Sequence, residues 1–575
     1  MLRDPTLARE MRHRVDRSTD PDLYQDVFDG THYKDLLTRD VSWKGRVCQP
    51  AAKYFQRDTD VALGFGTDGI APLERANDDF WPLLVTIYNL PPEIRTQREY
   101  QICCGFIPGS VDFPTSFTPD LMHILFENIM KQLLGLWDGS PKARQSRRFQ
   151  EEWAVSAEDW AALQHDITQS HASIPADIAR NISVPLDQRG SWTAESWSFF
   201  MMFMGPIALQ GRLRNPYYKH YLKLAKLARG LTKLVISTDD LVVMYREASE
   251  WVEEFEKLYY RGTPDNLHRC TAPIHALLHV VPIIAAQGPP CYYWCFAIER
   301  FGGWMKRSIK SRSQILKALT NTMITNEQIH SVLSTVSTAR RTHFKGWQDR
   351  ELGRAQRAAA LQDQNDAAPV DLASGFYDEV DFEPNNSLWS ALQKHLQSRL
   401  MTEGNPDPRI NMDVIKEMEF RAYSAYKAGP TGGNQVYRTP SNTRSKRDAS
   451  WIMYYVAEDR NAHRRIGAAP FRWERSPQCW GQVKVFLECD WDGESLALAV
   501  VRPRKTQQLI PEIPQGNLEF CPMQLLRNGS KVLQIVDSAH VTALAGRIAL
   551  SGRSAACEAI FETTMDLQRA EMTFT

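Results

Sequence analysis

The chain has 575 residues, and its 68 Lys and Arg balance its 68 Asp and Glu, so the formal net charge at pH 7 is zero. Dedicated nucleic-acid binders usually carry a net basic footprint, so this balance restricts any DNA contact to local basic patches. The 43% hydrophobic and 24% charged residues exclude a disordered chain and suffice for two or three domains with a core.

The chain shows no sign of secretion or membrane insertion. It opens on the charged string MLRDPTLAREMRHRVDR, its ten cysteines follow no disulfide-framework spacing, and no apolar run has the length of a membrane span. We therefore expect a reducing cytosolic or nuclear setting and no membrane.

Four regions follow one another along the chain. Residues 1–60 are polar and predict an irregular segment. Residues 61–110 hold the apolar runs VALGF, WPLLVTIYNL and ICCGFI, which predict strands. Residues 119–330 predict helices and residues 331–445 a mixture of helix and linker. Residues 446–575 contain short β-branched runs that predict a small β-rich domain, for which a barrel is one arrangement. The fold class expected is α/β plus α.

The first predicted helix begins at Asp120, in the string DLMHILFENIMKQLLGLW. Its apolar residues recur at spacings of three and four, which predicts one buried face. Asp120, after a proline, is well placed to cap this helix. His123 follows three residues later, so both side chains fall on one face, where they can share a metal or hydrogen-bond each other.

Asp68 stands at the edge of the first strand-like run, in GFGTDG. A carboxylate there suits a metal-dependent nuclease, because hard cations such as Mg²⁺ and Mn²⁺ take oxygen ligands. The alternative is a turn aspartate before a glycine.

A second constellation has the ligand types of zinc. His275 and His279 stand four apart in an apolar helical stretch, and Cys291 and Cys295 follow with the same spacing. We interpret the two histidines as a core pair satisfied by hydrogen bonds, so zinc is not expected.

Seven strings in a fixed order resemble those of a known family, the En/Spm-like (CACTA) DNA transposases of the basidiomycete fungal type. They span about residues 20 to 310, and a weaker similarity continues to about 550. The strings are DVFDGTHYKDL (26–36), DVALGFGTDGIAPLER (60–75), WPLLVTIYNLPPEIR (81–95), FPTSFTPDLMHILFENI (113–129), WSFFMMFMGPIALQGRL (197–213), YYKHYLKLAKL (217–227) and IHALLHVVPIIAAQGPPCYYWCFAIERFGG (274–303).

The resemblance implies a ribonuclease-H-like core that cuts and joins DNA in the nucleus with divalent metal ions, Mg²⁺ or Mn²⁺. Asp68 matches the family's first acidic residue, and Glu299 in FAIERFGG is assigned as the third. Glu299 can alternatively be a structural residue paired with Arg300, and Arg300 itself can contact a phosphate or serve structure. Asp120, supported by His123, is the candidate for the second acid.

Two departures from the family pattern predict a defective enzyme. The family's upstream Cys-rich segment is missing, and Ser110 is followed almost directly by Phe113, where the family has a long stretch that includes a strand and the second catalytic aspartate. The ribonuclease-H-like portion is therefore expected to be degenerate, beside a large helical region and a small β-rich C-terminal domain. The alternative function is a non-catalytic helical scaffold that binds DNA or protein partners.

Overall fold

The structure is a computed structural model of the chain. It describes most of residues 5–333 and separate segments beyond. The described residues are 5–43, 46–47, 52–68, 80–97, 100–108, 120–140, 151–175, 178, 186–308, 315–333, 368–370, 387–399, 401–402, 405–406, 411–418, 420–423, 425–427, 436–438, 447–459, 473–475, 479–491, 494–508, 524–529, 533–538, 541–550 and 557–562. The junction between Ser110 and Phe113, where the family has a long stretch, lies outside them, as does most of the region 331–445 predicted as helix and linker.

The N-terminal segment contains short helices where the sequence pattern predicts irregular chain. Its helices and strands are α1 (Pro5–Glu10), α2 (His13–Asp16), β1 (Leu23–Tyr24), η1 (Val27–Asp29), α3 (Thr31–Thr38), β2 (Ser42–Trp43) and β3 (Arg46–Val47). These elements are too short to show a hydrophobic periodicity, and buried ionic contacts hold them in place. Asp26 and Arg95, a residue of α4 (Pro92–Arg95), form a buried pair with 2.9 Å between Oδ1 and Nη1.

A three-stranded antiparallel sheet follows, with the order β4-β5-β6. Its strands are β4 (Leu63–Gly66), β5 (Phe80–Ile87) and β6 (Ile102–Pro108), as the three apolar runs predict. Leu84 of β5 packs into a cluster with Ile298 and Phe301, so the sheet lies against a later helix, α13 (Phe296–Ser308). This packing joins segments more than two hundred residues apart.

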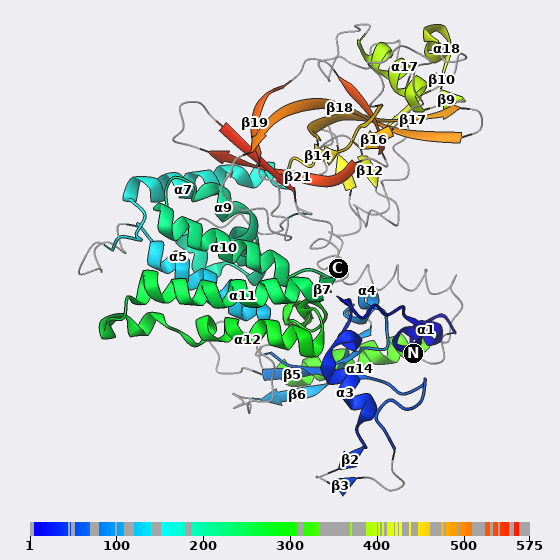
Figure 1. The fold of residues 1–575 in the computed structure, drawn as a ribbon. Coiled ribbons are helices and arrows are strands. Elements are labelled where there is room, and N and C mark those ends of the chain that lie inside the picture. Colours follow the sequence, from blue (N-terminus) through cyan, green and yellow to red (C-terminus); the bar gives the residue numbers. More distant parts are fainter. Residues whose placement is uncertain are drawn as a thin grey trace.

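The central region is a bundle of helices (Figure 1). Its elements are η3 (His123–Met130), α5 (Lys131–Trp137), α7 (Ala157–Ser170), η4 (His171–Ser173), η5 (Leu186–Ser191), α8 (Ala194–Phe199), η6 (Phe200–Met204), α9 (Gly205–Ala208), α10 (Asn215–Leu231), β7 (Ile236–Ser237), α11 (Thr238–Phe255), η7 (Glu256–Tyr260), η8 (Pro264–Arg269), α12 (Ala272–Gln287) and η9 (Pro290–Tyr292). Helix α13 and the next helix, α14 (Ile315–Leu333), pack with the three-stranded sheet instead. Helices α10, α11 and α12 stack side by side, and η3 contacts α12 and α8.

The predicted apolar face of the helix after Asp120 is confirmed. Its buried residues are Leu121, Leu125, Ile129 and Leu133, and the fifth predicted residue, Leu136, is half-buried and packs against the same core. The first two turns from His123 to Met130 are a π-helix rather than an α-helix. Such wider turns appear mostly as short segments, frequently at functional sites.

The bundle core contains a histidine that is held neutral. His220 is buried and stacks on Trp251 with ring centroids 4.5 Å apart, while its Nε2–H donates to the Trp251 carbonyl at 3.0 Å. The pKa of His220 is lowered to about 4, mainly by burial. The hydrogen bond to Trp251 and the charge of Glu254 act against this shift, and the charge of Lys223 adds to it.

This histidine predicts a pH dependence of stability. In the unfolded chain His220 takes up a proton below about pH 6.5, whereas in the folded chain it does so only near pH 4. The free energy of unfolding therefore has its full value above pH 6.5 and decreases as the pH falls toward 4. The loss reaches about 3 kcal/mol at pH 4. We expect His220→Phe to flatten this part of the profile of urea-unfolding free energy against pH. An unchanged slope between pH 6.5 and 4 would contradict the assignment.

The C-terminal part is built on a nine-stranded sheet in the order β20-β18-β19-β22-β21-β14-β17-β11-β8. Its strands are β8 (Ala368–Val370), β11 (Phe420–Tyr423), β14 (Trp451–Tyr454), β17 (Cys479–Trp491), β18 (Glu494–Gln508), β19 (Gln524–Gly529), β20 (Gln534–Asp537), β21 (Val541–Leu550) and β22 (Cys557–Glu562). A further pairing of β18 with β17 closes six of these strands into a ring, which is the arrangement of a barrel.

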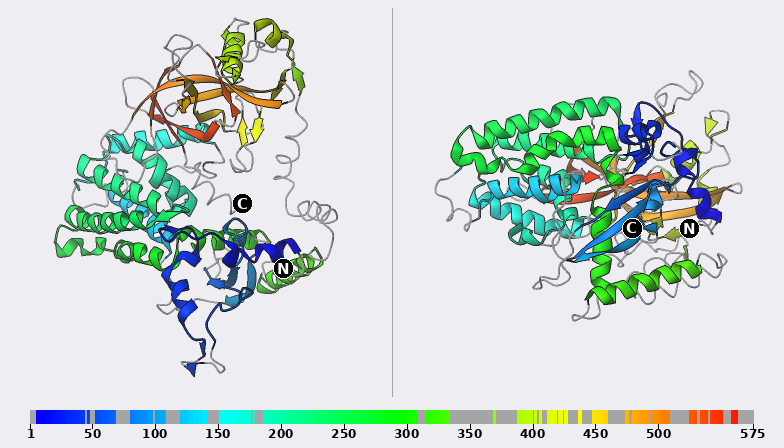
Figure 2. Two further views of the ribbon diagram at one scale, coloured as in Figure 1. Left: turned by 45° about the vertical axis from the view of Figure 1, so that its right-hand side comes forward. Right: turned by 90° about the horizontal axis from the view of Figure 1, so that it is seen from below.

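Smaller elements accompany this sheet. They are α17 (Ser387–Arg399), α18 (Met412–Glu417), and the two-stranded pairs β9 (Met401–Thr402) with β10 (Asn405–Pro406), β12 (Ala425–Lys427) with β13 (Val436–Arg438), and β15 (Ala457–Asp459) with β16 (Trp473–Arg475). The barrel rests on the end of α7 (Figure 2), where Ser173 donates to the Arg547 carbonyl at 2.8 Å.

Among the described residues, no single helix is long and apolar enough to cross a membrane. Only α12 together with Pro290–Ser308 passes such a test as a pair, and the two are bent by 70°.

Candidate metal centre

Strand β4 brings Asp68 to helix α13 through a close backbone approach. Gly66 lies against Ile298, and a Cβ atom at position 66 would stand 2.6 Å from the Ile298 Cδ1 atom. A larger residue would force the Ile298 side chain to move, so glycine permits this close contact. Asp68 follows Gly66 by two residues and Glu299 follows Ile298 by one, so this contact sets the two carboxylates side by side.

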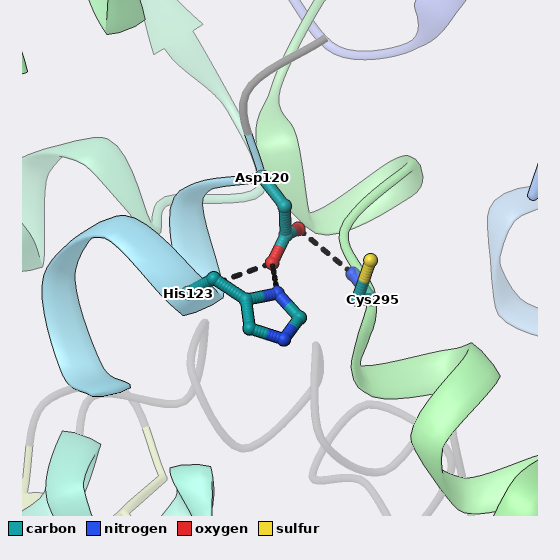
Figure 3. A group of neighbouring side chains, drawn as sticks. All are labelled: Asp120, His123 and Cys295. Atoms are coloured by element: carbon teal, nitrogen blue, oxygen red, sulfur yellow. Dashed lines mark hydrogen bonds and ion pairs between the residues drawn. The ribbon is translucent and has the colours of Figure 1, made fainter. Parts of the chain in front are cut away.

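Asp120 lies at the start of two helices, η3 and α13, and accepts a backbone hydrogen bond from each of these helix starts (Figure 3). Its Oδ2 atom accepts from the His123 backbone N–H at 3.0 Å and pairs with His123 Nδ1 at 2.8 Å. Its Oδ1 atom accepts from the backbone N–H of Cys295 at 2.9 Å, at the start of α13. A carboxylate in such a place satisfies free N–H groups and is favoured by the helix dipoles. The capping role predicted for Asp120 is therefore present.

Two groups of possible metal ligands share His123. Asp68, His123 and Glu299 each offer one ligand atom, and these atoms lie within 4.8 Å of one another. Asp120, His123 and Cys295 meet the same limit. The residues of both groups are half-buried. The structure thus brings together all three acids assigned from the sequence, with His123 between them.

The electrostatics of this centre favour an added positive charge. Burial and the charges of the neighbouring carboxylates Glu127 and Asp68 together raise the pKa of Glu299 to about 7, with burial the largest cause, while the charge of His123 acts in the opposite direction. The hydrogen bond that His123 donates to Asp120 is the main cause that raises the pKa of His123 to about 9, so its imidazole is charged at neutral pH. A bound cation would replace the positive charge of the protonated His123 and neutralise the neighbouring carboxylates.

Cys295 and Glu127 belong to this centre but were not assigned to it from the sequence. Burial raises the pKa of the Cys295 thiol well above its usual range, and Asp120 adds to the effect, so the thiol keeps its proton. Glu127 lies one helical turn beyond His123, in the string HILFE, and this i, i+4 spacing was the signal that could have identified it.

The other sequence-predicted candidates lie outside the two ligand groups. Arg300 is half-buried on α13, directly after Glu299. His275 and His279 bond to each other, with their Nε2 atoms 3.2 Å apart, but they are exposed on α12 rather than in the core as predicted. Cys291 is buried, and its thiol donates to the Lys233 carbonyl. The zinc pattern read from the sequence is therefore not assembled by these four residues.

A groove of about 430 Å³, lined in part by Glu127, lies between the helix formed by η3 and α5 and the start of α12. Lys131 and Arg269 are also among the residues that line it. Gln132 fixes the two walls, because its side chain donates to the Arg269 carbonyl at 2.6 Å and accepts from Thr271 at 2.7 Å.

Residues 39–164 match a family described as transposase family tnp2. The match supports a transposase-derived protein. It covers Asp68, Asp120 and His123, and so takes in one side of the metal centre, whereas Glu299 and Cys295 lie beyond it. No curated protein and no solved structure matches the chain.

Proposed function

We propose that the chain is a CACTA-like transposase-derived protein of the fungal type that binds a divalent cation, Mg²⁺ or Mn²⁺, and DNA in the nucleus, and is defective in strand transfer. The observation that supports this most is the convergence of Asp68, His123 and Glu299 from three separate segments of the chain. The ancestral activity is cleavage and joining of transposon ends on a degenerate ribonuclease-H-like core.

The donor set fits a hard cation. Asp68 and Glu299 supply carboxylate oxygens, which Mg²⁺ and Mn²⁺ prefer, and water completes such sites. When bound, the cation would neutralise charge on phosphate oxygens of the DNA backbone. Asp120 holds the Nδ1 side of the His123 ring, which turns Nε2 away from that carboxylate, and a carboxylate in this position orients a metal-binding imidazole.

The defect follows from how Asp120 is used. Two-metal cleavage of phosphodiesters requires carboxylates that bridge both ions. Both Asp120 oxygens accept backbone hydrogen bonds, from His123 and from Cys295, so Asp120 stays at the starts of two helices and does not join the ligand group of Asp68 and Glu299. The remaining acids, Asp68 and Glu299, suit one cation.

DNA binding is the part of the function that we expect to survive. We expect Lys131→Glu, in the groove beside Glu127, to weaken binding of duplex DNA and to reduce the salt slope of the binding constant by about one. Fluorescence anisotropy at several salt concentrations measures both quantities. Arg246→Glu, an exposed charge change on α11, is the matched control and should leave them nearly unchanged.

The central experiment compares metal binding with DNA cleavage in the full chain. Calorimetric titration with Mn²⁺ should detect one site in the wild type and none in Asp68→Asn, whereas the exposed control Glu253→Gln should bind as the wild type does. Labelled duplex DNA incubated with Mn²⁺ should stay uncut. Absence of Mn²⁺ binding would favour the non-catalytic scaffold, and cleavage that depends on Asp68 would refute the proposed defect.

A further inference from the structure

The second ligand group in the centre has a different chemistry from the first. Asp120, His123 and Cys295 offer one oxygen, one nitrogen and one sulfur, and these ligand atoms lie within 4.8 Å of one another. Mg²⁺ and Mn²⁺ avoid sulfur, whereas zinc takes Cys, His and Asp together. No part of the proposed hard-cation site requires a thiol.

The backbone fixes this group before any ion arrives. The hydrogen bond from the Cys295 N–H to Asp120 Oδ1 joins the start of α13 to the start of the helix that contains η3. The hydrogen bond between Asp120 Oδ2 and His123 Nδ1 fixes the orientation of the imidazole ring (Figure 3). Oδ2 and Nδ1 are 2.8 Å apart and share a proton. A zinc ion needs both atoms about 2.0–2.2 Å from itself, so a small widening of this pair would admit it in place of the proton.

We propose that Asp120, His123 and Cys295 form a binding site for Zn²⁺, and that Zn²⁺ there excludes Mg²⁺ or Mn²⁺ from the neighbouring site. Three protein ligands with water in the fourth position are a common zinc arrangement. On binding, the Cys295 thiol proton and the proton shared by Asp120 and His123 pass to solvent, and sulfur and nitrogen bind the ion. The exclusion of Mg²⁺ or Mn²⁺ rests on the proposed function, because His123 is then a ligand of both sites. The zinc site itself does not depend on the proposed function.

The first test uses Co²⁺ in place of Zn²⁺, because a Co²⁺–thiolate bond gives a charge-transfer absorption band in the near ultraviolet. The wild-type full chain should show this band, and added Zn²⁺ should remove it. Cys295→Ser should abolish the band and lower Zn²⁺ affinity on the order of 100-fold. Cys104→Ser, at an exposed cysteine, should retain both. A missing band in the wild type, or a band that survives Cys295→Ser, overturns the site.

The second test separates this site from the proposed function. Mn²⁺ bound to the wild type, followed by electron paramagnetic resonance, should be released by one equivalent of Zn²⁺, and Cys295→Ser should resist this release. Asp68→Asn should lose Mn²⁺ but keep the Co²⁺ band. If the wild type binds no Mn²⁺, the proposed function fails while the Co²⁺ band still decides the zinc site. Mn²⁺ that remains bound at one equivalent of Zn²⁺ overturns the exclusion. Circular dichroism checks that each variant folds.

Discussion

Arg95→Met is expected to lower the free energy of unfolding by about 3–5 kcal/mol, because it leaves a buried carboxylate without its partner. Arg95 and Asp26 are both almost fully buried, and the guanidinium contacts both carboxylate oxygens. Urea unfolding followed by tryptophan fluorescence measures the change. Removal of the side chain of exposed Arg12, which pairs with Asp16, is the control and should lower the free energy of unfolding by less than about 1 kcal/mol.

The same pair predicts an acid-dependent loss of stability. Burial alone would raise the pKa of Asp26, but the Arg95 charge and the hydrogen bonds from His13 and Arg95 outweigh it and lower the pKa to about 2. The carboxylate therefore contributes stability that is complete above its unfolded pKa near 3.8 and disappears as the pH falls toward 2. The contribution is about 2 kcal/mol.

A double variant distinguishes an unpaired charge from lost packing. Asp26→Asn combined with Arg95→Met leaves no buried charge alone, so we expect it to be more stable than Arg95→Met by at least about 1 kcal/mol. If the two substitutions instead add up, the ion pair does not couple these residues. The pair matters for the fold because it joins η1 to α4, and so fixes the N-terminal segment beside the sheet that carries Asp68.

The helix after Asp120 could be predicted from the sequence because its information is local. A run of apolar residues at helical spacing determines which face is buried, and Asp120 and His123 lie within one turn of each other. The three strands of the first sheet were predictable for the same reason. The short helices of residues 5–38 were not, since burial of Asp26 and Asp29 holds them rather than an apolar stripe.

The centre itself joins residues that no pattern could bring together. Asp68 and Glu299 are 231 positions apart, and only a family resemblance suggested that they belong to one site. Cys295 was interpreted as a partner of Cys291 because of their spacing. In the structure Cys295 contacts Asp120 at the start of α13, whereas Cys291 is buried beside Lys233. Likewise, β8 and β11 join the C-terminal sheet from a region whose composition is that of a linker. Such pairings depend on tertiary contacts rather than on local pattern.

Glu299→Gln should change stability in opposite directions with and without a divalent cation. Without metal, burial and the charges of Glu127 and Asp68 place the pKa of Glu299 near 7, so its ionisation costs the folded chain stability. This cost is absent below its unfolded pKa near 4.5 and is complete above pH 7. At pH 8 the variant should therefore be more stable than the wild type, by about 1–3 kcal/mol in the free energy of unfolding.

With Mn²⁺ the order should reverse. A cation at one hundred times its dissociation constant stabilises the folded wild type by about 2.7 kcal/mol, and Glu299→Gln removes one of the oxygens that would bind it. Thermal unfolding at pH 8 with and without Mn²⁺ gives four melting temperatures, and the exposed variant Glu253→Gln supplies the control for charge alone. A rise in stability without metal together with loss of the Mn²⁺ response supports a carboxylate placed for a cation. A variant that is less stable in both conditions would instead indicate that Glu299 is a structural partner within α13.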